Sequence, residues 1–151
     1  MTVFVKIIKP IIVWIVSSLM AIIIGVTAQT QFILNRYSQL GIDISFQDRL
    51  STTVYDIQHL GSVYGLFLSI ALAIAFLASG TLFHFTKKYR SIIYAVAGGV
   101  AILVLLFSMK AAFFNIHMIN GARDFFGITF QFLAGILAGY IFSKLTFKRH
   151  K

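Results

Sequence analysis

The sequence predicts an all-α membrane protein, a four-helix bundle in which each helix crosses the bilayer. Of the 151 residues, 59% are hydrophobic and only 11% are charged, and the mean hydropathy is +0.91. A soluble domain has about 25% charged residues, so lipid must be the solvent for much of this surface. A spanning helix needs roughly 20 mostly apolar residues. The chain offers four such windows in a single integral membrane domain (1–151): 7–28, 61–83, 91–112 and 125–142.

The first window begins just after Lys6 and has Lys9 in its first turn. A positive start, an apolar core and the sequence Val26-Thr27-Ala28 also resemble a signal peptide with its cleavage site. The apolar run is long for a signal peptide, so we interpret it as an uncleaved anchor. Cleavage would leave three spans in the same orientation.

Residues 29–60 form the only sizeable segment between windows. Gly41 follows a helical pattern and is a plausible helix stop. Ser45 with Asp48 three residues later has the form of a capping box, which predicts that the second helix starts near Phe46 and projects outside before it enters the membrane around Gly61. About 32 residues are too few for an independent soluble domain without disulfides or metal. We therefore expect an amphipathic segment that lies along the outer membrane face.

The loop 84–90 is only seven residues long, so the second and third windows should form an antiparallel hairpin. In the next connection, Asn120-Gly121 indicates a turn or helix cap before the fourth window.

The charges predict the orientation of these spans. Nine cations and no acid lie at the start of the first window, in loop 84–90 and after the fourth window: Lys6, Lys9, Lys87, Lys88, Arg90, Lys144, Lys148, Arg149 and Lys151. The other side carries four cations and four aspartates: Arg36, Arg49, Lys110, Arg123, Asp43, Asp48, Asp56 and Asp124. By the positive-inside rule both termini face the cytoplasm. The basic charge then reflects topology and attraction to anionic lipids at the cytoplasmic face, and we expect no nucleic-acid binding.

One group of polar residues is expected at the outer level of the bundle. Asp56 and His59 lie three apart in the helix that enters the membrane, while Lys110 is roughly 30 Å along the third helix from Arg90. With His117, Arg123 and Asp124, they could bind an anionic headgroup, a quinone or a small anion. The alternative is that they only pair across the bundle and tie helices together.

The sequence gives little support to other chemistry. It contains no Cys, no Glu and no acid within a span, which argues against thiol chemistry, proton relays and acidic channel rings. No metal site is predicted, although His59 and His117 leave haem b as a weak alternative.

Small residues predict close helix packing. The sequence GILAG contains Gly135 and Gly139, and Gln131 lies one turn before Gly135. Further glycines reduce the side-chain bulk of the second and third windows, which lets helices approach closely. The positions singled out for packing are Gly61, Gly65, Gly98, Gly99, Gln131, Gly135 and Gly139. They could serve internal packing, a homo-oligomer or a membrane protein partner.

Three functions follow as expectations. The first is a small inner-membrane accessory or scaffold subunit that works through helix packing and is not an enzyme. The second is a carrier or binding protein for an anionic lipid, quinone or small anion. The third is a single-haem redox protein.

Overall fold

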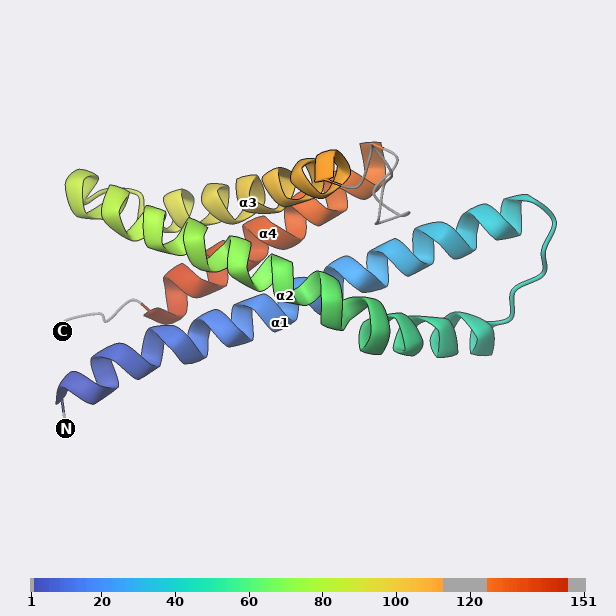
Figure 1. Cartoon of the computed structure of the whole chain (residues 1–151), viewed down its shortest axis with the longest axis horizontal. Helices are drawn as coiled ribbons and strands as arrows, with labels where there is room; N and C mark the ends of the chain where they lie inside the picture. Colours follow the sequence, from blue (N-terminus) through green and yellow to red (C-terminus); the bar gives the residue numbers. More distant parts are fainter. Residues whose placement is uncertain (1, 113–124, 147–151) are drawn as a thin grey trace.

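The computed structural model describes residues 2–112 and 125–146, and side chains from residue 8 onward. Over these residues the chain forms α1 (Thr2–Gln39), α2 (Phe46–Thr86), α3 (Arg90–Ala112) and α4 (Phe125–Thr146) (Figure 1). All four are long and apolar enough to cross a membrane, which indicates a multi-pass membrane protein. The predicted all-α, four-helix fold is confirmed for this part of the chain, while the orientation of the termini stays a prediction.

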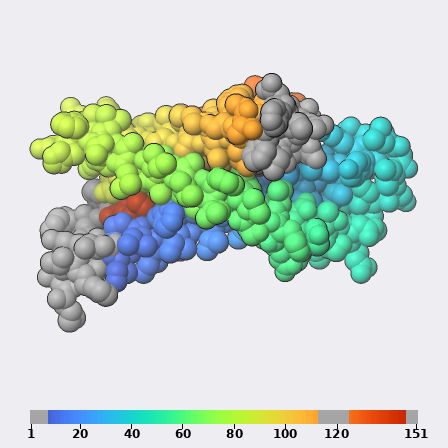
Figure 2. All heavy atoms as spheres, viewed as in Figure 1, coloured from blue at the N-terminus to red at the C-terminus, as the bar shows by residue number. Residues whose placement is uncertain are grey.

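The helices come in two lengths. At 1.5 Å per residue, the 23 residues of α3 and 22 of α4 span about 33–35 Å, which matches a hydrocarbon core of roughly 30 Å. The 38 residues of α1 and 41 of α2 span about 57–62 Å and exceed it by a wide margin. The longer pair therefore extends well beyond the ends of α3 and α4 (Figures 1 and 2).

The structure of residues 29–60 differs from the expected amphipathic segment. Residues 29–60 are the ends of α1 and α2 joined by the short link 40–45, and no separate amphipathic element is present among them. The link turns at Gly41, whose φ of +84° lies in the left-handed region that glycine adopts without strain. We call residues 29–60 the outer hairpin. Its position relative to the membrane face stays a prediction.

The start of α2 follows from its capping box. The Ser45 hydroxyl accepts a hydrogen bond from the Asp48 amide at 3.1 Å, and the Ser45 amide donates to the Asp48 carboxylate at 3.2 Å. These bonds satisfy two backbone donors that a helix start otherwise leaves open. The sequence predicted this start at Phe46.

The link between α2 and α3 is shorter than the predicted seven residues. Only Lys87, Lys88 and Tyr89 separate the two helices. Lys87 adopts a left-handed conformation (φ 52°), and its amide donates to the Phe83 carbonyl at 2.8 Å. This bond caps the last turn of α2 and turns the chain into α3.

The bundle closes as a ring. α1 packs on α2 and α4, and α3 packs on α4 and α2, whereas α2 and α4 lie diagonally and touch little. The core between them is apolar and includes Val26, Leu68, Leu72, Ile102 and Ala138. The ends of α1 and α2 on the side of the chain termini lie far apart, while on the other side the link 40–45 joins the two helices (Figure 1).

Candidate functional site

Glycines bring α3 and α4 into backbone contact. A Cβ added at Gly98 would collide with the Gly135 carbonyl, and one at Gly139 would collide with the Tyr94 carbonyl. A Cβ at Gly99 would lie 2.5 Å from the Phe132 ring. These residues therefore pack within one chain, and the two faces they occupy are not open to a second copy or a partner.

Gln131 connects three helices through buried hydrogen bonds. Its side-chain Nε2 donates to the Gly25 carbonyl of α1 at 2.9 Å, and its Oε1 accepts from the Tyr64 hydroxyl of α2 at 3.1 Å. A Cβ at Gly25 would lie 2.6 Å from Gln131 Oε1, so the absence of a side chain there makes room for the amide. Gly61 and Gly65 accommodate Ile22 of α1 in the same region.

The predicted outer polar cluster is not assembled among the described residues. Asp56 faces α1, where its carboxylate accepts a hydrogen bond from the Thr30 hydroxyl at 2.7 Å. His59 is exposed, stacks on Tyr55 at 4.0 Å between ring centroids, and places its Nδ1 3.0 Å from the Tyr55 carbonyl oxygen. Within residues 2–112 and 125–146, no ion pair joins Asp56 to Lys110, which lies half-buried in the last turn of α3.

The rest of the cluster is outside the described residues. His117, Arg123 and Asp124 all fall in 113–124, so the haem alternative through His59 and His117 stays a prediction. In the part of the chain that the structure describes, no group of three His, Asp or Glu side chains could hold a metal ion.

The outer hairpin has a polar seam between its helices. Gln31 Nε2 donates to the Thr53 hydroxyl at 2.9 Å, and Arg49 Nη1 donates to Gln31 Oε1 at 3.3 Å. With the bond between Thr30 and Asp56, these contacts hold the ends of α1 and α2 together through polar side chains. Polar pairing of this kind is suited to an aqueous or headgroup environment, because water satisfies the remaining groups.

The tip of the hairpin exposes large apolar side chains. Phe46 is 81% and Leu40 is 77% exposed, and Ile42 and Leu50 are each more than half exposed. This patch was not predicted from the sequence, because exposure depends on how α1 and α2 pair. The only signal in the sequence was that these residues sit among charged ones such as Asp43 and Arg49.

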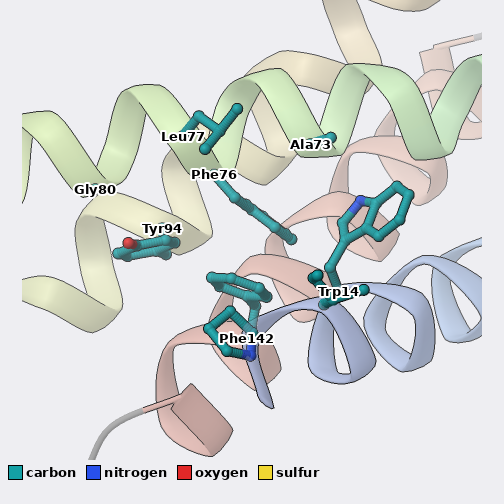
Figure 3. A pocket seen from close by; sticks show the side chains of 9 residues that line it. Trp14, Ala73, Phe76, Leu77, Gly80, Tyr94 and Phe142 are labelled. Atoms are coloured by element: carbon teal, nitrogen blue, oxygen red, sulfur yellow. The ribbon is translucent and has the colours of Figure 1, made fainter. Parts of the chain in front are cut away.

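A cavity of about 350 Å³ lies at the opposite end, where α1 and α2 diverge. Pro10, Ile11 and Trp14 line it from α1, and the remaining walls come from the other three helices: Ala73, Phe76, Leu77, Gly80, Tyr94 and Phe142. In Figure 3 the rings of Trp14, Phe76, Tyr94 and Phe142 surround this space. Figure 2 shows part of α4 between α1 and α2 at this place.

Arg90 connects α2, α3 and α4 beside this cavity. Its Nη2 donates to the Thr146 hydroxyl at 2.6 Å, and its Cζ lies 5.3 Å from the Tyr94 ring and 5.5 Å from the Phe83 ring. These distances are typical of cation–π contacts. We call this end the cationic end, and its described basic side chains are Lys9, Lys87, Lys88, Arg90 and Lys144.

Comparison with known proteins gives no relative: no family model, no curated protein and no solved structure matches the chain.

Proposed function

We propose that this chain is a small inner-membrane accessory or scaffold protein, with both termini cytoplasmic, whose bundle presents the outer hairpin to a partner protein. One observation carries the proposal: the hairpin ends in the exposed apolar residues Leu40, Ile42, Phe46 and Leu50, on helices too long to be used up in crossing lipid. Exposed apolar patches rimmed by polar residues mark interaction sites in proteins.

The length of the projection favours a protein partner over the bilayer itself. From residue 29 to Gln39, α1 continues for about 15 Å beyond its predicted span. A straight continuation along the bilayer normal would hold Phe46 and Leu40 beyond the headgroups, where an apolar side chain gains nothing from lipid. A partner that covers Phe46 would remove its apolar surface from water. This burial stabilises a complex by about 25 cal/mol per Å², from which the entropy lost on association must be subtracted.

The glycines do not serve this role. Gly98, Gly135 and Gly139 are occupied by contacts between α3 and α4, so leucine at these positions would disturb the bundle itself. A test of partner binding must therefore change the hairpin tip and leave the bundle intact.

The test is site-specific photocrosslinking in native membranes. A benzophenone amino acid in place of Leu50 should give a discrete protein adduct, and a Phe46→Asp change one turn away should remove it. The same probe in place of Leu66, which is 61% exposed on the membrane part of α2, is the matched control and should label lipid. Lipid adducts alone at Leu50 would contradict the proposal and support an amphipathic segment on the membrane surface.

A further inference from the structure

The cavity at the cationic end is lined by all four helices, each of which is long and apolar enough to cross a membrane. It is walled by the aromatic stack of Phe76 on Phe142, with 4.3 Å between ring centroids, and of Tyr94 on Phe142, with 5.4 Å. On the remaining side, the Trp14 indole donates a hydrogen bond to the Ser69 carbonyl at 3.1 Å, which ties α1 to α2 where the two begin to diverge. These contacts keep the walls of the cavity in place.

The cavity is open at its rim and small residues keep it wide. Leu77 is 74% and Ile11 is 47% exposed, so the mouth between α1 and α2 faces the surroundings of the bundle. At Gly80 a Cβ would lie 3.3 Å from the Tyr94 hydroxyl oxygen, closer than is usual, so glycine leaves room for the phenol. A volume of about 350 Å³ is within the range of roughly 300–1,000 Å³ typical of small-molecule pockets.

The mouth lies next to a region of one charge sign. Lys9 directly precedes Pro10 in the lining, Arg90 contacts the ring of Tyr94, and Lys87 and Lys88 form the adjoining turn. Among the described residues, the three carboxylate side chains, Asp43, Asp48 and Asp56, all belong to the outer hairpin at the other end of α1 and α2. Of the side chains that the structure describes, an anionic group at this end would therefore meet several cations and no competing acid.

We propose that this cavity is a binding site for an anionic phospholipid, with one acyl chain between α1 and α2 and the phosphate at the cationic end. The apolar, aromatic walls suit a hydrocarbon chain, and the adjacent cations suit a phosphate. A transmembrane helix from a partner is about 10 Å wide and is too thick for this space. The site is distinct from the outer hairpin, so the proposal stands independently of the scaffold function.

Trp14 allows a direct test, because it is the single tryptophan of the chain and lines the cavity. The protein would be placed in phosphatidylcholine nanodiscs that contain a small, varied fraction of lipid with brominated acyl chains, which quench tryptophan fluorescence on contact. Brominated phosphatidylglycerol should quench Trp14 at lower mole fraction than brominated phosphatidylcholine, and the quenching should saturate. Equal quenching by the two lipids, or a linear rise without saturation, would overturn the proposal, because that is the behaviour of bulk bilayer lipid.

Two matched pairs of variants separate the cavity from general attraction of anionic lipid. Arg90→Gln should reduce the preference for phosphatidylglycerol roughly fivefold, the effect of one cation near a membrane surface, while Lys110→Gln at the other end of α3 should not. Ala73→Phe should fill the cavity and remove the saturable quenching. Ala78→Phe, on the α2 face that meets α3 instead, should keep it. Saturable quenching that survives Ala73→Phe in a folded protein would also overturn the proposal. Should that variant fail to fold, the saturation test on the unchanged chain decides.

Discussion

Gln131 and Gly25, 106 residues apart in the chain, are joined by a buried hydrogen bond from the glutamine amide to the glycine carbonyl. The same amide accepts from Tyr64, so one side chain of α4 links α1 and α2 at the centre of the bundle. Hydrocarbon offers no alternative hydrogen-bond partner for these groups, so each bond contributes to the stability of the bundle.

Removing either member of this network should destabilise the bundle, and the two effects should not add. We expect Gln131→Leu and Tyr64→Phe each to lower the free energy of unfolding by about 0.6–2 kcal/mol. In the Gln131→Leu background, Tyr64→Phe should have little further effect, because the phenol has already lost its acceptor. Denaturation in mixed micelles would measure the four stabilities of this cycle. Additive losses would show that the bond contributes nothing of its own.

Leucine at Gly139 should separate α3 from α4. The new side chain would meet the Tyr94 carbonyl and the Cα of Ala95, both of them backbone atoms that are unable to rotate away. We expect a loss of roughly 1–3 kcal/mol or more from overpacking, visible as a lower thermal midpoint in detergent. Ala111→Leu, on an exposed face of α3, is the matched control and should leave the midpoint unchanged. If Gly139→Leu instead kept stability and changed only the oligomeric state, the glycine would belong to an interface between chains.

The capping box should stabilise the outer start of α2 locally. Ser45→Ala removes the acceptor for the Asp48 amide and should cost about 1 kcal/mol. Hydrogen exchange at the first amides of α2 should become faster, while the membrane part of the helix stays protected. Ser51→Ala serves as the control, because the Ser51 hydroxyl bonds only to the exposed Asp48 carbonyl. Equal exchange in the two variants would argue against the cap.

Introduced cysteines can test the pairing of α1 and α2 in the outer hairpin, since the chain has no cysteine of its own. The Thr30 hydroxyl oxygen lies 2.7 Å from an Asp56 carboxylate oxygen. The double variant Thr30→Cys and Asp56→Cys should therefore form a disulfide readily under mild oxidation. Thr30→Cys combined with His59→Cys should react much more slowly, because His59 turns away from α1. Gel mobility after proteolysis between the two positions would report the bond. A faster reaction in the control pair would contradict the hairpin.

The charge distribution predicts the topology, and reporter fusions can check it. A fluorescent protein that folds only in the cytoplasm should be bright when fused after the last residue. Alkaline phosphatase, which is active only outside the cytoplasm, should be active when inserted in the link 40–45. This expectation follows from nine cations on one side against a balanced set on the other. The reverse pattern of the two reporters would invert the orientation proposed for the hairpin.

Much of the helical architecture could be predicted from the sequence, because each membrane helix needs a long apolar run and lipid allows few other structures. The start of α2 was also accessible, since the bonds between Ser45 and Asp48 are local. The length of α1 was not: the polar residues from Gln29 onward indicated an exit from lipid, but no proline or glycine lies between Gln29 and Gly41 to end the helix. A helix can leave the lipid and continue as a helix, so polar residues alone do not mark where it ends.

The contacts between helices were harder to foresee. The spans are apolar on nearly all sides, so periodicity does not show which face meets a neighbour. Gln131 was singled out as a packing position, yet its hydrogen-bond partners depend on how three distant helices meet. Asp56 was expected to face Lys110 or a ligand, and its bond to Thr30 arises only because α1 continues beside it. The cavity likewise results from the divergence of α1 and α2, which has no local signal.

The unbroken course of α1 and α2 has a consequence for how this protein can vary in length. One residue added to an α-helix rotates everything beyond it by about 100°. Phe46 and Leu40 therefore face a direction fixed by the rotational phase of the helices inside the bundle. Insertions in the link 40–45 leave that phase unchanged, whereas a single residue added between Thr30 and Gln39 would rotate Leu40 about the α1 axis while Phe46 keeps the direction set by α2. The hairpin can be lengthened freely only at its turn.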